Sequence, residues 1–179
     1  MSRIFSQRLL LLAGALIGLA VSLQSQNTTL AKETALRFLQ SNPTTFNLSR
    51  QDVADVRITD TYVSRHNGVT HVWVQQQHAG IPLYNGLFGL HVKSDGSVFH
   101  LGHRFVSNLS ERANTTLPSL APSRALELAL VQLGFTSDQA PGVLRKVDER
   151  NWVFEKGTVS KAEIPVKICY DLDKKGQPR

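Results

Sequence analysis

An α+β fold is predicted by the order of segments along this chain, which runs helix, strands, helix, strands. Apolar residues recur at helical spacing over residues 29–39 and again over 122–133. The segments after the first helix show the near-alternation of half-buried strands, and strand-like stretches follow the second. A helix laid across an antiparallel sheet buries one face of both elements. We therefore expect two tandem lobes of this kind, although no residue-level repeat is visible between them.

The first helix is expected over residues 29–39, where apolar residues share one face. Thr29 is a residue type suited to capping its start. The Asn42-Pro43 step ends the helix, because a residue before proline avoids the helical backbone region.

An antiparallel meander follows, with turns that contain Gly between its strands. Gly80 allows a sharp reversal, and Pro82 fits a strand start or sheet edge because it lacks an N–H group. In the last strand we expect Phe99, Leu101 and Phe105 to share one face. The four strands are expected over residues 53–63, 69–78, 83–92 and 98–106.

After a polar connector over residues 108–118 the pattern starts again. Pro122 fits the first turn of a helix, and Gly134 fits the position after its end. Further strands are expected over residues 143–147, 152–154 and 164–170. The second lobe is short of strands, so we expect a fragment of a longer precursor. The apolar face of this helix is expected to carry Ala125, Leu126, Ala129, Leu130 and Leu133.

The N-terminus has the pattern of a secretory signal peptide over residues 1–22. Arg3 and Arg8 precede an apolar run over residues 9–21, and Ala20-Val21-Ser22 offers small residues for cleavage near Ser22. The run is short for a helix that spans a bilayer, so we expect secretion and no stable membrane span after signal removal. A short membrane anchor is the alternative.

Composition points to a globular protein, with 41% hydrophobic and 19% charged residues among 179. The formal net charge is +6, but no run of five like charges occurs, so the excess is interpreted as a mildly basic surface. We expect no nucleic-acid partner.

The six histidines do not form a recognisable metal site. None begins an H-E-x-x-H pattern, which would place two zinc ligands and a base on one helix face. In a regular strand His100 and His103 would point to opposite faces. We interpret all six as surface or hydrogen-bonded histidines: His66, His71, His78, His91, His100 and His103.

Catalytic patterns are absent from the sequence as well. It holds no G-x-S-x-G elbow, phosphate loop or G-x-G-x-x-G fingerprint. Asp52, Asp55 and Asp60 are interpreted as solvated strand ends, and the single Cys169 as a small buried hydrophobe. We expect no catalytic, cofactor-binding or metal site in this chain.

The central block resembles a known family. Residues 68–77 read G-V-T-H-V-W-V-Q-Q-Q, residues 78–85 read H-A-G-I-P-L-Y-N, and residues 95–98 read D-G-S-V. In this order and spacing they resemble the fungalysin/thermolysin propeptide (FTP) domain. Among the three consecutive glutamines, at least one is expected to point inward and bond backbone groups. The motif residues, interpreted as structural, are Gly68, His71, Trp73, Gln76, Gln77, Gly80, Ile81, Pro82, Asn85, Asp95 and Gly96.

The resemblance implies a domain order and a role. The order is an FTP domain over residues 28–107, a PepSY-like and incomplete lobe over 118–172, and a truncated tail over 173–179, both lobes being cystatin-like. The role is that of a non-catalytic propeptide, an intramolecular chaperone and inhibitor, of a secreted fungalysin-like zinc metallopeptidase precursor. Its partner would be the catalytic domain in cis, where zinc is expected. A free-standing secreted protease inhibitor or binding module is the alternative.

Four sequons for N-linked glycosylation complete the sequence features. They matter if the chain is made by a eukaryote. They begin at Asn27, Asn47, Asn108 and Asn114.

Overall fold

The computed structural model describes residues 26–173 and 176–179, and the predicted signal peptide lies outside them. Helices and antiparallel sheets make up the described chain, so the fold is α+β as predicted. Contacts divide it into two compact units. The first contains residues 26–76 and 86–107, and the second contains 77–85 and 108–179. No helix in the described ranges combines the length and apolar character needed to cross a membrane.

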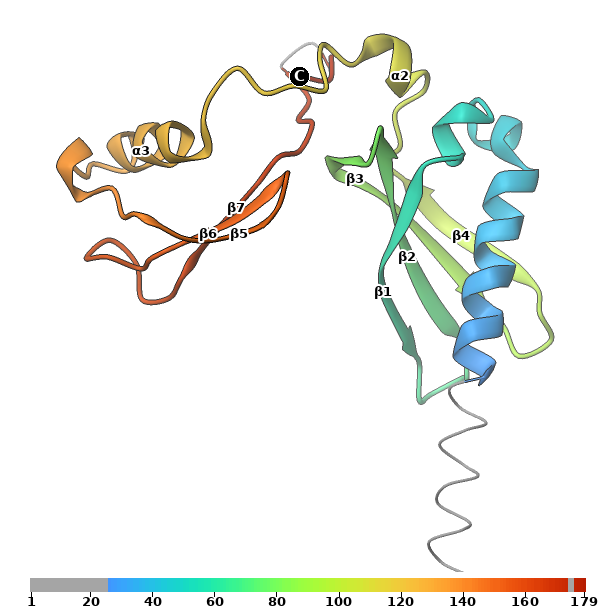
Figure 1. The fold of residues 1–179 in the computed structure, drawn as a ribbon. Coiled ribbons are helices and arrows are strands. Elements are labelled where there is room, and N and C mark those ends of the chain that lie inside the picture. The colour runs from blue at the N-terminus through green and yellow to red at the C-terminus, as the bar shows by residue number, and fades with distance from the viewer. Residues whose placement is uncertain (1–25, 174–175) are drawn as a thin grey trace, which may run out of the picture. The chain divides into compact units, whose positions relative to one another are not determined.

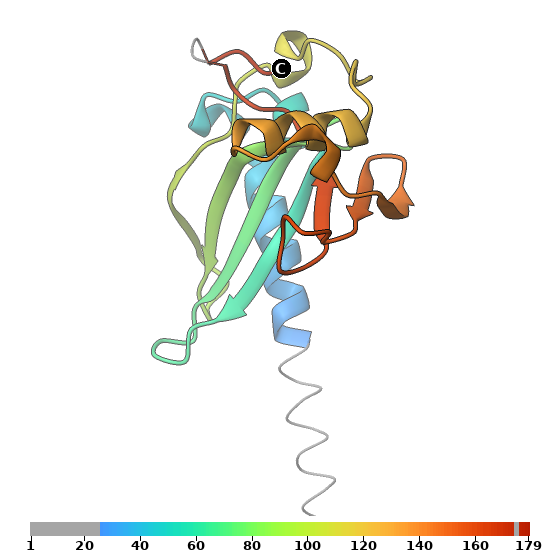
Figure 2. The ribbon, with the colours of Figure 1, turned by 90° about the vertical axis from the view of Figure 1, so that its left-hand side faces the viewer.

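The first unit is built from a helix over residues 26–41 and a four-stranded sheet (Figure 1). Figure 2 shows the same helix from the side, running across one face of this sheet. Two 3-10 turns, η1 (Pro43–Phe46) and η2 (Gln51–Val53), connect the helix to the sheet. The strands are β1 (Val56–Val63), β2 (Thr70–His78), β3 (Ile81–Val92) and β4 (Val98–His103), hydrogen-bonded in the order β1-β2-β3-β4.

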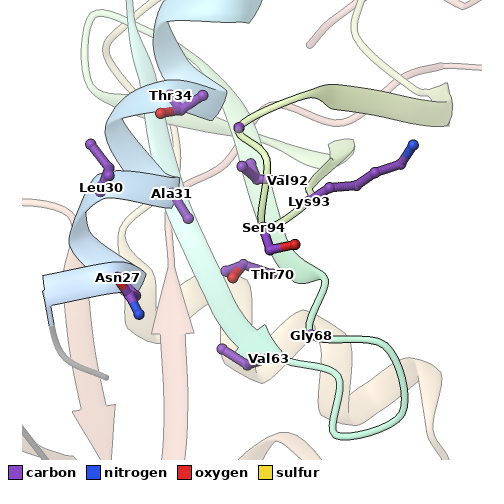
Figure 3. A pocket seen from close by; sticks show the side chains of 11 residues that line it. Asn27, Leu30, Ala31, Thr34, Val63, Gly68, Thr70, Val92, Lys93 and Ser94 are labelled. Atoms are coloured by element: carbon purple, nitrogen blue, oxygen red, sulfur yellow. The ribbon is translucent and has the colours of Figure 1, made fainter. Parts of the chain in front are cut away.

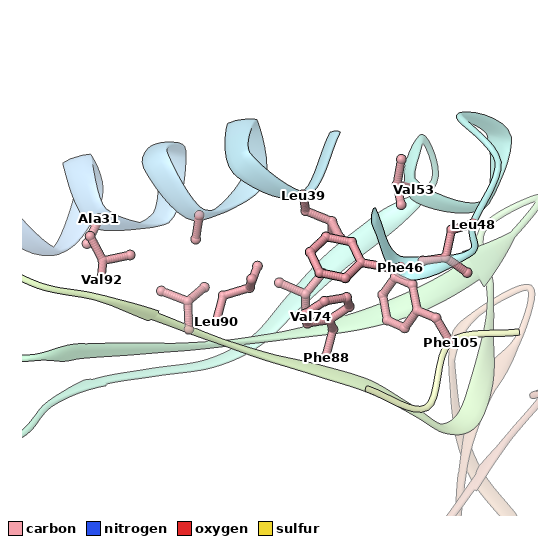
Figure 4. Packing of buried hydrophobic residues seen from close by; sticks show 12 residues of the cluster. Ala31, Leu39, Phe46, Leu48, Val53, Val74, Phe88, Leu90, Val92 and Phe105 are labelled. Carbon is pink, nitrogen blue, oxygen red and sulfur yellow. The ribbon is translucent and has the colours of Figure 1, made fainter. Parts of the chain in front are cut away.

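The core of this unit lies between the helix and the sheet (Figure 4). Burial alternates along β2, so that Val72 and Val74 are fully buried and the residues between them are not. Phe46 of η1 meets Phe88 of β3 edge to face, with ring centroids 4.9 Å apart. The helix contributes Ala31, Ala35 and Leu39, as its sequence spacing predicted.

A bulge between β3 and β4 overturns two predictions. Phe88 pairs with His103 and Leu90 with His100, so β4 uses one residue more than β3 over this stretch. The regular alternation expected for residues 98–106 is therefore lost. Phe105 lies in the core, whereas Leu101 is 86% exposed, so Phe99, Leu101 and Phe105 do not all share one face.

The second unit contains a short helix, a longer helix and a three-stranded sheet. Helix α2 (Leu109–Arg112) falls within the segment expected to be a connector. Leu126 and Leu130 pack with Phe154, but Leu133 is 74% exposed because the helix ends before it, contrary to prediction. The other elements are α3 (Pro122–Gln132), η3 (Ser137–Gln139), β5 (Val143–Asp148), β6 (Asn151–Phe154) and β7 (Ile164–Lys167), with sheet order β5-β6-β7.

The β2–β3 hairpin tip, residues 77–85, belongs to the second unit through Tyr170. The Tyr84 N–H donates to the Tyr170 carbonyl at 2.7 Å, and the Tyr170 N–H donates to the Pro82 carbonyl at 2.9 Å. The Tyr170 hydroxyl donates to the Thr115 carbonyl at 2.9 Å. Tyr170, only 2% exposed, therefore joins the hairpin tip to the connector within this unit.

Candidate functional site, an aromatic face of the first sheet

Aromatic rings from all four strands gather on the first sheet, on the face opposite the helix. Val72 and Val74 point to the helix, so their neighbours on β2 point away from it. The ring of Tyr62 stacks on His71 at 4.6 Å between centroids, and His91 contacts both His71 and Phe99. We call this group the aromatic face; it comprises Tyr62, His71, Trp73, His91 and Phe99.

Two histidines form the centre of the aromatic face. The Nδ1 atoms of His71 and His91 lie 2.8 Å apart, so one ring must donate and the other accept. His91 is only 4% exposed. Burial lowers the pKa of His91, and the nearby His71 and His100 lower it further. The neutral form is therefore favoured in the folded protein.

Trp73 covers Gly89 on the adjacent strand. A Cβ atom at Gly89 would lie 3.0 Å from the Trp73 ring, closer than side chains normally approach. The indole ring also meets His91 edge to face at 6.4 Å between centroids. The absence of a side chain at Gly89 thus gives Trp73 its position over the sheet.

Gln76 is the inward-pointing glutamine that the triple-Gln sequence predicted. Its Oε1 accepts from the Val106 N–H at 2.7 Å, and its Nε2 donates to the Val106 carbonyl at 2.8 Å. Nε2 also reaches the Asp52 carbonyl at 3.4 Å. Gln76 is fully buried, so it links β2 to the segments before β1 and after β4.

His100 and His103 lie on the same side of the sheet, so the prediction of opposite faces is wrong. Both rings contact Phe46 and Phe88, because the bulge rotates His103 back to the helix side. The Phe105 N–H donates to His103 Nδ1 at 3.1 Å. Burial, and then the neighbouring His100, lower the pKa of His103.

Three motif residues build turns of the first unit. Gly68 has a φ of +68° and Gly96 a φ of +82°, values that favour glycine. Asp95 Oδ1 accepts from the Ser97 N–H at 2.8 Å, and hydrogen bonds from Ser97 lower the pKa of the Asp95 carboxyl. These turns connect β1 to β2 and β3 to β4.

The other motif residues form the hairpin tip in the second unit. Ala79 and Gly80 both have positive φ, of 50° and 70°, the combination of a type I′ turn. A Cβ at Gly80 would lie 2.6 Å from Arg150 Nη1, so the guanidinium packs directly on this glycine. Gln77 Nε2 donates to the Gly80 carbonyl at 3.4 Å. Ile81 is buried, and the Pro82 carbonyl accepts from the Tyr170 N–H. Asn85 is exposed and has a φ of 58°.

A pocket of about 510 Å³ opens between the first described turns of the helix and the turn ends of the sheet (Figure 3). Leu30 and Ala31 line it from the helix, and Thr70 and Val92 from the sheet. The only ionisable side chain among the described residues that line it is that of Lys93. The described pocket lining therefore contains no His, Cys, Asp or Glu side chain.

Metal ligands and nucleophiles are sparse in the part of the chain that the structure describes. It contains no group of three or more His, Cys, Asp or Glu side chains placed to hold a metal ion. Cys169 is exposed, contrary to prediction, and partial burial together with Asp171 raises the pKa of its thiol, which disfavours the thiolate.

Asp52 was predicted to be a solvated strand end, and the structure shows it buried instead. It is only 2% exposed, and its Oδ2 accepts from the Ser49 N–H at 2.8 Å and the Ser49 hydroxyl at 2.7 Å. The reason is that residues 51–53 form a 3-10 helix rather than a strand end. Sequence reasoning missed this residue, although Ser three positions before Asp is a local hydrogen-bonding pattern.

Comparison with known proteins places this face within a matched segment. Residues 54–105 match the model of the Fungalysin/Thermolysin Propeptide Motif, which confirms the sequence resemblance over that segment. The chain is 29% identical over 129 residues to "Extracellular metalloproteinase mep" of Aspergillus niger, covering 69% of this chain and 20% of that protein. It is 42% identical over 52 residues to "Extracellular metalloproteinase 2" of Phaeosphaeria nodorum, covering 29% of this chain and 8% of that protein. The chain thus spans about a fifth or less of these relatives.

Proposed function

Because residues 54–105 carry the fungalysin/thermolysin propeptide motif, we propose that this chain is the propeptide region of a secreted, fungalysin-like zinc metallopeptidase precursor. It acts as an intramolecular chaperone and inhibitor of the catalytic domain, and it is not itself catalytic. The observation that carries this proposal is the motif match. The similarity to two fungal extracellular metalloproteinases supports it.

Linkage to the catalytic domain explains how a domain without an active site has an effect. A propeptide that binds only the folded catalytic domain stabilises that state by mass action. Because the two parts share one chain, their effective concentration is high, on the order of millimolar for short flexible linkers. Zinc belongs to the catalytic domain in this proposal, and the His71–His91 pair, with two nitrogens only, is not its site.

The aromatic face is the surface through which we expect the first unit to contact the catalytic domain. Tyr62 is 48% exposed and Phe99 is 37% exposed, and aromatic side chains are enriched at protein interfaces. Both rest on the partly or fully buried histidines beneath them, so they are held in fixed positions.

Two measurements test the proposal. The purified chain is added to a thermolysin-like protease during peptide hydrolysis, and it is added to the same catalytic domain during refolding from urea. Inhibition and a higher refolding yield are expected. Tyr62→Ala with Phe99→Ala should weaken both effects, whereas Leu30→Ala, which removes an exposed apolar side chain from the helix, should not. Absence of both effects would overturn the proposal.

A free-standing secreted inhibitor or binding module is the alternative function. It predicts inhibition of a folded protease without any gain in refolding yield. A reading frame without an H-E-x-x-H segment downstream of this sequence would also favour it.

The propeptide proposal includes several finer features. They are the FTP boundaries at 28–107, the PepSY-like character of residues 118–172, the tandem cystatin-like arrangement, secretion, and cleavage near Ser22.

A further inference from the structure

Two of the four sequons share one local geometry. Asn47 follows η1 with φ 56° and ψ 35°, and Asn108 precedes α2 with φ 56° and ψ 42°. Both side chains are exposed. In each case the next residue is a buried leucine, Leu48 at 5% exposure and Leu109 at 1%. In both turns an exposed asparagine with a left-handed backbone thus precedes a leucine that burial holds in place.

The other two sequons differ from this arrangement. Asn27 lines the 510 Å³ pocket beside the helix, as Figure 3 shows. Asn114 lines a second pocket of about 250 Å³, and its Oδ1 accepts from the Thr115 N–H at 2.8 Å. A bulky group at Asn27 or Asn114 would therefore lie over a pocket. Neither residue precedes a buried leucine as Asn47 and Asn108 do.

We infer that Asn47 and Asn108 are N-glycosylation sites in a eukaryotic host. The inference rests on the proposed function in one respect, namely that the chain enters the secretory route. The side-chain amide nitrogen would attack the anomeric carbon of a lipid diphosphate-linked oligosaccharide. A C–N bond forms, the C–O bond to the diphosphate breaks, and the amide loses one proton.

Transfer takes place on the chain before it folds, so the folded structure decides whether the glycan is tolerated. At both turns the asparagine is exposed and the leucine that follows it is buried. A glycan is bulky and hydrated, and it prevents another protein surface from packing on the residues around it. We therefore expect neither turn to contact the catalytic domain.

The experiment is to secrete the full chain from yeast, once with its own N-terminus and once with a host signal sequence. Enzymatic deglycosylation in ¹⁸O-labelled water then marks each glycosylated Asn as labelled Asp for mass spectrometry. Asn47→Gly and Asn108→Gly remove the acceptors and preserve the positive φ, since glycine adopts it freely. Asn85→Gly is the matched control, because Asn85 is exposed, has a φ of 58° and lies outside any sequon.

Label at both Asn47 and Asn108 is the expected result, with one step of gel mobility lost in each single glycine variant and none in Asn85→Gly. No label at either residue, or label at only one of them, would overturn the inference. If only the host signal gives secretion and the sites are labelled, the secretion part of the proposed function fails and the inference stands. If the secreted chain inhibits the protease but carries no label, the inference fails and the proposed function stands.

Discussion

His71 and His91 face each other through their Nδ1 atoms at 2.8 Å, on neighbouring strands of the first sheet. Only one proton fits between these two Nδ1 atoms, because two protonated rings would place two N–H donors and two positive charges against each other. His91 is buried, and its burial together with the neighbouring His71 and His100 lowers its pKa. The pair is therefore suited to the neutral state.

Acid should destabilise the first unit through His91. Its pKa is lowered in the folded protein, chiefly by burial and then by His71, so the unfolded chain takes up a proton at higher pH. The stability is present above the unfolded pKa of about 6.5 and is lost as the pH falls through the folded value. Urea midpoints between pH 7.5 and 4.5 should decrease, and His91→Gln should flatten this dependence. His66→Gln, in the exposed β1–β2 turn, is the control. An equal slope in His91→Gln and the wild type would contradict the assignment.

Removing the Gln76 side-chain amide should destabilise the protein strongly. In Gln76→Leu the Val106 N–H and carbonyl lose their buried partner, and each unsatisfied group costs about 1–3 kcal/mol. We expect a loss of roughly 2–4 kcal/mol in the free energy of unfolding, measured in urea. Gln75→Leu is the matched change, because the Oε1 atom of Gln75 accepts from the exposed side chain of Arg57. Equal losses for the two variants would argue against the bridge.

A methyl group at Gly89 should displace Trp73. The Cβ of Gly89→Ala would lie 3.0 Å from the indole, and overpacking of this kind costs about 1–3 kcal/mol. A double-mutant cycle measures the effect: Gly89→Ala should cost less in a Trp73→Phe background, where the smaller ring leaves room. If the two costs are the same, the close approach of the ring does not explain the glycine.

The hairpin tip can be stabilised by one substitution. Ala79 has a φ of 50°, which a residue with a Cβ adopts at a cost of about 1–2 kcal/mol, whereas Asn tolerates it better. Ala79→Asn creates the Asn-Gly pair favoured in type I′ turns, and we expect a gain of about 0.5–1 kcal/mol in the free energy of unfolding. Gly80→Ala should do the reverse, because the new Cβ would meet Arg150 as well as the strained φ. Thermal unfolding of the two variants side by side checks both signs.

Much of the fold followed from local patterns. The period of apolar residues located the helix over residues 26–41 and α3, and alternation located strands of the first sheet. The motif at residues 68–98 carried the resemblance to the fungalysin/thermolysin propeptide motif, which the family model matches over residues 54–105. The inward glutamine was expected because consecutive strand residues alternate between faces.

Tertiary structure decided what periodicity could not. Buried positions in β3 are odd-numbered at Ile81 and Leu83 and even-numbered from Gly86 to Phe88, with Asn85 at positive φ between them. If the pairing of β2 with β3 stayed regular from the hairpin turn, His71 would lie opposite Phe88, whereas in the structure its ring contacts His91. The bulge opposite β4 moved His103 in the same way. Sequence alone determined which segments are strands, whereas the irregular residues within them decided which side chains meet, because one extra residue reverses every face that follows it.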